Sequence, residues 1–234
     1  MSPTSFFNFT FLPEYYTMFL QGIVYTLLLS VCAVLLAIIP AMLLAVLRLS
    51  KIKIIKFLSG LYIDIFRSTP LLVQLSLIYF GIFTYIKLPS TQIFGFVNMS
   101  MFIPGVLALA LNSSAYVAEI FRAGILAVDA GQTEAARSLG LSSAAAMFKV
   151  VLPQAVKNVL PALANEVITM VKESSICSML GMMELMWAAK TVAATTYITI
   201  GPYVVAALVY FCINYPASKA IEAIERRMRR GDKR

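Results

Sequence analysis

Residues 23–47, IVYTLLLSVCAVLLAIIPAMLLAVL, contain no charged side chain. A helix rises about 1.5 Å per residue, so a run of this length crosses the roughly 30 Å hydrocarbon core of a bilayer. Pro40 lies inside the run and is expected to kink the helix. The stretch therefore predicts a first membrane-spanning helix, and the rest of the chain is interpreted around it.

The composition of the whole chain supports a membrane protein. Of the 234 residues, 60% are hydrophobic and only 13% are charged, whereas soluble domains carry about 25% charged residues. The mean hydropathy is +0.85. These values predict one all-α integral membrane domain.

Four further spans are expected after the first. The uncharged run 68–86 forms most of a second span that starts near Leu61, and Arg67-Ser68-Thr69-Pro70 is expected to start or kink it, with Ser68 and Thr69 bonding backbone groups freed by the proline. Residues 87–101 read as a loop. The later segments are a third span at 102–122, a polar connector at 123–157, a fourth span at 158–181 and a fifth at 203–220.

Lysine and arginine are distributed unevenly between the two sides of this arrangement. Fifteen lie in the 48–56 loop, in the connector counted from Arg122 at its start, and in the segment from Lys219 onward, and only Lys87 and Lys190 lie on the opposite side. Positive loops stay in the cytoplasm, so we expect the N-terminus outside and the C-terminus inside. The predicted organisation is an outer segment 1–22, a transmembrane domain 23–220 and a basic, partly disordered cytoplasmic tail 221–234. The N-terminus has no basic region, so no cleaved signal peptide is expected.

Several chemistries are excluded or disfavoured by the residues present. The chain has no histidine, and its three cysteines are isolated in apolar runs, which argues against a metal or redox site. Only one of its three aspartates, Asp64, lies near a predicted span, so an intramembrane protease built on two aspartates is disfavoured. The sequence also lacks the G-x-x-x-x-G-K-[ST] loop that binds nucleotide phosphates.

The connector has the signals of two short helices. Thr133 can cap a helix that begins at Glu134, Gly140 suits the left-handed position after its end, and Ser142 can cap a second helix. Two such helices at an angle, here called the elbow (residues 134–153), suit a docking surface. Leu139, Met147 and Phe148 are available to fill a pocket on a partner. An ordinary loop that packs on its own bundle explains the same pattern.

The segment EAARSLGLSSAAAMFKVVLP, residues 134–153, resembles the EAA signature of ATP-binding-cassette importer permeases. The glycine at 140 and the Leu-Pro pair at 152–153 match the signature, whereas Val150 stands where isoleucine is usual. Three flanking stretches resemble the polar amino acid uptake branch of that family, the histidine, glutamine and arginine type: FRSTPLLVQLSLIYFG (66–81), NSSAYVAEIFRAGI (112–125) and NEVITMVKESS (165–175). The resemblance covers about residues 20–228.

This resemblance implies a type I importer permease in a bacterial inner membrane. It implies that the connector forms coupling helices that dock on an ATPase subunit through Glu134, Ala135, Ala136, Gly140, Leu152 and Pro153. It also implies a second permease copy or a homologous permease, and a periplasmic or lipid-anchored amino-acid-binding protein that holds much of the selectivity. ATP and Mg²⁺ are expected on the ATPase, and no cofactor or metal on this chain.

Polar residues inside the predicted spans are candidates for a substrate pathway, since charges are expensive in a membrane. Asn112, Tyr116 and Glu119 share one face of the third span, and Arg122 can pair with Glu119. The full set of candidates is Asn112, Ser113, Tyr116, Glu119, Glu166, Thr169 and Glu173. The alternative is that these residues only hold helices together.

Two functions remain open from the sequence. The favoured one is the permease subunit of an ATP-driven importer for a polar amino acid, which moves its cargo by alternating access. The alternative is a stand-alone ion-coupled carrier or channel for a small polar solute, which would use Glu119, Glu166 and Lys172 as coupling groups and need no ATPase.

Overall fold

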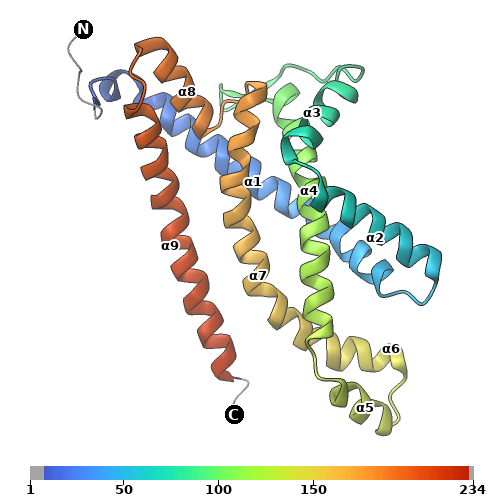
Figure 1. The fold of residues 1–234 in the computed structure, drawn as a ribbon. Coiled ribbons are helices and arrows are strands. Elements are labelled where there is room, and N and C mark those ends of the chain that lie inside the picture. The colour runs from blue at the N-terminus through green and yellow to red at the C-terminus, as the bar shows by residue number, and fades with distance from the viewer. Residues whose placement is uncertain (1–7, 232–234) are drawn as a thin grey trace.

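The computed structural model describes residues 8–231, with side chains to residue 228, and is almost entirely helical. In chain order the elements are α1 (Leu12–Arg48), α2 (Lys53–Ser68), α3 (Leu71–Gly81), β1 (Gln92–Ile93), β2 (Val97–Asn98), α4 (Met99–Leu126), α5 (Ala130–Ser138), α6 (Ser143–Ala146), a π-helical segment (Met147–Val151), α7 (Leu152–Glu173), a 3-10 segment (Ser174–Leu180), α8 (Leu185–Thr196) and α9 (Gly201–Gly231). Figure 1 shows α4, α7 and α9 with roughly parallel axes, α7 running opposite to the other two, while α1 crosses behind them.

Within residues 8–231, three helices are individually long and apolar enough to cross a membrane, namely α1, α4 and α9. Two bent pairs raise the number to as many as five: α2 with α3, and the helix through α7 with α8. The expectation of about five spans in an all-α membrane protein agrees with this arrangement.

The second span differs most from the expectation of a run continuing to Ile86. The chain bends by 105° between α2 and α3, and α3 ends at Gly81. The physical cause is Pro70, which lacks a backbone N–H and forces the preceding residue out of the helical region. Thr69 is accordingly extended, with φ −111° and ψ 145°. The predicted kink at Thr69-Pro70 is confirmed, and a continuous second span is wrong.

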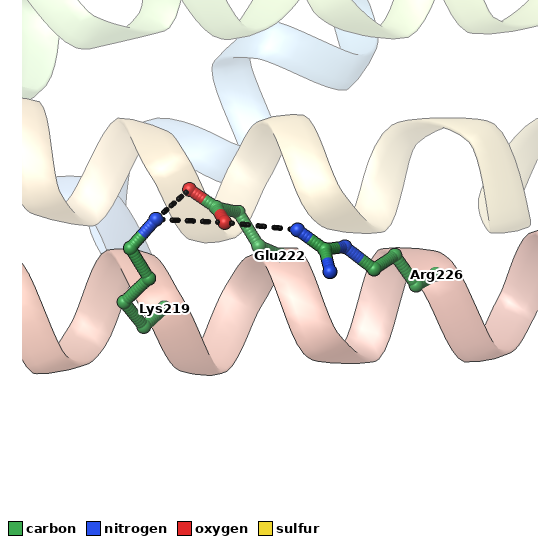
Figure 2. Close-up of polar contacts among 3 residues, drawn as sticks. All are labelled: Lys219, Glu222 and Arg226. Atoms are coloured by element: carbon green, nitrogen blue, oxygen red, sulfur yellow. Dashed lines mark hydrogen bonds and ion pairs between the residues drawn. The ribbon is translucent and has the colours of Figure 1, made fainter.

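The two ends of the described chain are more helical than expected. Helix α1 begins at Leu12, so residue 22 lies inside a helix, and α9 continues through the basic segment to Gly231. The basic segment is therefore helical as far as residue 231, while residues 232–234 of the tail that was expected to be partly disordered lie outside the described residues. Glu222 supports this last part of α9, because it pairs with Lys219 at 3.0 Å and with Arg226 at 3.5 Å, three and four residues away (Figure 2).

The main core lies where α1 packs against α4. The side of α1 that faces the core carries an alanine at every fourth position, and all four are buried: Ala33, Ala37, Ala41 and Ala45. Small side chains at this spacing let two helices approach closely in a membrane, where dispersion replaces the hydrophobic effect as the attraction. Leu109 of α4 and Met170 of α7 complete the core.

A short hairpin connects α3 to α4 through the segment expected to be a loop. Strands β1 and β2 pair antiparallel, with Ile93 opposite Val97. Asn98 then caps α4 by accepting a hydrogen bond from Ser100 N at 3.0 Å. Helix α4 therefore begins at Met99, three residues before the expected start of the third span.

The break between α7 and α8 is held by a buried carboxylate. Glu184 is fully buried, and its two oxygens accept hydrogen bonds from Met186 N (2.8 Å), Trp187 N (2.7 Å) and the Tyr210 hydroxyl (2.9 Å). Thr26 of α1 accepts from Leu185 N at 3.1 Å. The first three N–H groups of α8 thus have side-chain partners, as a helix start away from water requires.

We predict that Glu184→Ala destabilises the protein by about 2–3 kcal/mol, because three buried donors lose their acceptor. Glu184→Gln is the matched control, since its amide oxygen still accepts, and its effect should be smaller. The measurement is thermal unfolding in detergent followed by fluorescence of Trp187, the single tryptophan of the chain. Equal stability of the two variants would contradict the role of Glu184.

Candidate functional site

The first short helix of the connector starts earlier than expected. Asp129 caps α5 by accepting from Gly131 N at 2.8 Å, so the helix begins at Ala130. Thr133 is therefore inside the helix, and the prediction that it forms the cap is wrong. Glu134 and Ala135 are exposed in the middle of α5, while Ala136 is buried. The helix presents one face to solvent, and its other side packs against α6 and the π-helical segment.

The turn after α5 has the geometry predicted for it. Gly140 has φ +87°, its N–H donates to Arg137 O at 3.0 Å, and Leu141 N donates to Ala136 O at 3.1 Å. This pair of bonds is a Schellman motif, which needs a left-handed residue at the glycine position. Ser142 then accepts from Ala145 N at 3.1 Å, so the predicted second cap is also confirmed.

The second connector helix does not stop before the membrane domain. Helix α6, the π-helical segment and α7 follow each other without a break, and the Leu152 N–H donates to Met147 O across five residues. Pro153 comes next and has no N–H to offer. No helix break marks the boundary expected near residue 157, and α6 continues directly into the helix that enters the membrane domain.

The elbow exposes apolar side chains at its surface. Leu139 is 84% exposed and Phe148 is 68% exposed, while Ala146 and Val151 are buried. Gln154 Nε2 donates to Gln132 Oε1 at 3.3 Å and links α7 to α5.

Figure 1 shows α5 and α6 at the same end of the molecule as the end of α9. Of the remaining residues expected to dock, Gly140 and Pro153 are exposed and Leu152 is half-buried.

Two of the predicted pathway residues meet between α4 and α7. The Ser113 hydroxyl donates to Glu166 Oε1 at 2.8 Å, and both side chains are buried. A carboxylate at this depth is expensive unless hydrogen-bonded. The pair therefore joins two spans through a polar contact inside the bundle.

Asn112 takes part in a different network, at the break between α2 and α3. Its Nδ2 donates to Gln74 Oε1 at 2.8 Å, and Gln74 Nε2 donates to Phe66 O (2.8 Å) and Thr69 O (3.0 Å). Thr69 Oγ1 donates to Ile65 O at 2.8 Å, as expected for a residue before proline, whereas no such bond from Ser68 is seen among the described residues. These bonds satisfy carbonyls that the bend exposes.

Two further pathway candidates, Glu119 and Tyr116, each contact an arginine. Arg122 Nη2 pairs with Glu119 Oε2 at 2.7 Å, which confirms the predicted ion pair. Arg67 lies over the Tyr116 ring, 5.6 Å from its centroid. Thr169 and Glu173 are half-buried on α7 and make no side-chain hydrogen bond within residues 8–228. The seven predicted pathway residues thus do not form one continuous group.

Sequence reasoning missed three polar residues of the membrane domain: Gln74, Glu184 and Lys190. Gln74 is a single amide in an apolar run, and that isolation is the signal that could have found it. Lys190 was counted only as an outer-loop charge, yet it lines a cavity of about 800 Å³ bounded by α3, α7, α8, α9 and the 3-10 segment. None of the seven predicted pathway residues lines this cavity.

Comparisons with known proteins agree with the helical arrangement. The family model described as the binding-protein-dependent transport system inner membrane component matches residues 33–230. The putative glutamine transport system permease protein GlnP of Rickettsia felis is 42% identical over 223 residues, which is 94% of this chain and 98% of the relative. The arginine transport system permease protein ArtQ of Bacillus subtilis is 37% identical and covers 91% of this chain and 93% of its own.

A solved structure is similar over nearly the same length. The crystal structure of an amino acid ABC transporter with histidines aligns with a TM-score of 0.84 and 44% sequence identity. The alignment covers 94% of this chain and 98% of the other. The likeness supports a type I importer permease fold.

We predict that Gly140→Val loosens the turn between α5 and α6. A Cβ at this position meets no atom within 4 Å, so only the left-handed backbone opposes the substitution, at about 1–2 kcal/mol. Hydrogen exchange at Leu141 N should accelerate roughly five- to thirtyfold. Gly140→Asn is the control, because asparagine tolerates this conformation. Equal exchange in the two variants would refute the prediction.

Proposed function

The chain belongs to the family of binding-protein-dependent transport system inner membrane components, and from this premise we propose that it imports a polar amino acid with the help of a separate ATPase. The relatives named for glutamine and arginine transport, and the solved amino acid transporter, support this choice of cargo. The observation that carries the proposal is the elbow, which exposes apolar side chains and continues into α7 without a break.

The ATPase docks on the elbow. This chain has no phosphate-binding loop of its own, so ATP and Mg²⁺ belong to the partner. Leu139 and Phe148 fill a groove on the partner, and the small Ala135 lets its backbone come close. Glu134 and Gly140 complete the docking surface, together with Ala136, Leu152 and Pro153 at its inner edge.

Motion passes from the elbow to the spans through α7. Because α6, the π-helical segment and α7 form one continuous helix, a displacement of α6 displaces α7 as a lever. Closure of two ATPase subunits draws two elbows together and rocks the spans around the pathway, which gives alternating access. A stand-alone carrier requires no such elbow, and membership of a binding-protein-dependent family disfavours it.

A second permease, either a copy of this chain or a homologue, packs against α9. The apolar window of α9 is only 6% buried within the single chain, and Leu208, Phe211 and Tyr215 are exposed along it. An amino-acid-binding protein delivers the cargo from outside. Because the elbow and the end of α9 lie at one end of the molecule (Figure 1), the positive-inside bias assigns that end to the cytoplasm and residues 1–22 to the outside.

We predict that Glu134→Tyr abolishes co-purification of the ATPase, since a bulky ring at this exposed site obstructs the docking surface. Membrane insertion of the variant should stay normal, because Glu134 makes no contact with the bundle's core. The measurement is the amount of ATPase recovered with a tagged permease. Lys87→Tyr, at an exposed position outside the elbow, is the control. Full recovery of the ATPase with Glu134→Tyr would argue against docking at the elbow.

We predict that Glu166→Ala lowers uptake about tenfold, equivalent to roughly 1.4 kcal/mol of barrier, while the assembly stays intact. The reason is that Glu166 contributes a buried carboxylate to the moving contact between α4 and α7. Ser113→Ala is the matched comparison, since it removes only the hydrogen bond. Uptake of labelled amino acid into proteoliposomes measures the effect. Normal kinetics in Glu166→Ala would make the residue purely structural.

A further inference from the structure

The cavity of about 800 Å³ is large enough to hold an amino acid. It lies between the last turn of α7, α8 and the first half of α9, with Leu72 of α3 at one side. Its rim includes the exposed residues Lys172, Met179 and Tyr203, so it is open at the surface of the single chain. Figure 1 shows α8 joining α7 and α9 at the end of the molecule opposite the elbow.

Both charged side chains in the lining are lysines, Lys172 and Lys190. In the described part of the chain neither ammonium group forms an ion pair, and the polar contact of Lys190 Nζ is with Met179 Sδ at 3.5 Å. A thioether is a weak acceptor. Charged groups are expensive in a membrane domain, and among the described residues these two lysines have no carboxylate as ion-pair partner. Their position therefore indicates a site for an anionic group of a ligand.

The carboxylates that influence these lysines do not reach the cavity. Lys172 is attracted by Glu173 and Lys190 by Glu184, but neither glutamate lines the space. Glu184 is fully buried, and its oxygens already accept from two backbone N–H groups and from Tyr210. A solute that enters the cavity therefore meets ammonium groups before it meets any carboxylate.

Uncharged groups complete the lining. The Ser175 hydroxyl donates to Lys172 O at 2.7 Å, which leaves its oxygen lone pairs available to a ligand. Tyr203 and Tyr210 add aromatic faces and phenolic oxygens, which can accept a ligand ammonium group or contact it through the ring. The cavity thus offers positive charge for a carboxylate and neutral acceptors for the rest of a zwitterion.

We propose that this cavity is a substrate site and that Lys172 and Lys190 select amino acids with a carboxylate or carboxamide side chain over cationic ones. The inference rests on the proposed function and narrows its cargo class. One lysine pairs with the α-carboxylate, and the other contacts the side-chain oxygen of glutamate or glutamine. Arginine places a second cation against the same lysines, where like charges repel by an amount that grows as water is excluded.

The test is equilibrium binding of radiolabelled L-glutamine, L-glutamate and L-arginine to the permease–ATPase complex in nanodiscs. The binding protein is left out, so that its selectivity does not enter. We expect arginine to bind about tenfold more weakly than the other two. Lys172→Gln and Lys190→Gln should each remove most of that preference, and the double change to glutamate should reverse it toward arginine. Lys87→Gln, outside the cavity, is the matched control.

Uptake of the same amino acids by the complete transporter, with its binding protein, separates the two possible failures. If uptake is normal but arginine binds as well as glutamine and the lysine variants change nothing, the charge selection is wrong and the proposed function stands. If no amino acid is taken up at all, the proposed cargo itself is wrong and this inference falls with it. Loss of permease dimers in the lysine variants would assign the lysines to the subunit interface and overturn the site.

Discussion

Inside a bilayer no water is available to bond a backbone N–H or C=O that a helix leaves free, and this constraint organises the whole structure. In the described residues two breaks lie within apolar sequence, one between α2 and α3 and one between α7 and α8, and buried polar side chains bond the backbone groups at each. At the first break Gln74, which Asn112 holds in place, donates to the carbonyls left by Pro70, and at the second Glu184 and Thr26 accept from the N–H groups of α8. The bends are therefore fixed in direction by specific tertiary bonds.

These two breaks also place the parts that bear on transport. The bond from Tyr210 to Glu184 ties α9 to the start of α8. These two helices form one side of the cavity, and Lys190 of α8 lines it. At the other end of the molecule, the Schellman turn at Gly140 and the helix through Pro153 connect the exposed elbow to α7. A single helix thus runs from the proposed motor contact to Lys172 at the edge of the proposed substrate site.

The features that could be predicted from the sequence are those set by neighbouring residues. The apolar runs, Gly140, the cap at Ser142 and the Glu119–Arg122 pair all follow from local spacing and are confirmed. The size of the bend at Pro70, the cap at Asp129 and the carboxylate site of Glu184 were not predicted. Asp129 is a local signal that was overlooked in favour of Thr133. The site of Glu184 depends on Tyr210, 26 residues away, and periodicity contains no information on such a pair. Whether the predicted docking residues bind an ATPase stays a prediction.

The wide turn at 147–151 accommodates one residue more than a regular helical turn would. Each residue added or removed at such a point rotates the two flanking stretches relative to each other by about 100°. The exposure of Phe148 and the burial of Val151 therefore depend on that one extra residue. Reversion of the segment to regular α-helix would turn the elbow about the axis of α7. The docking surface and α7 would then no longer face their respective partners.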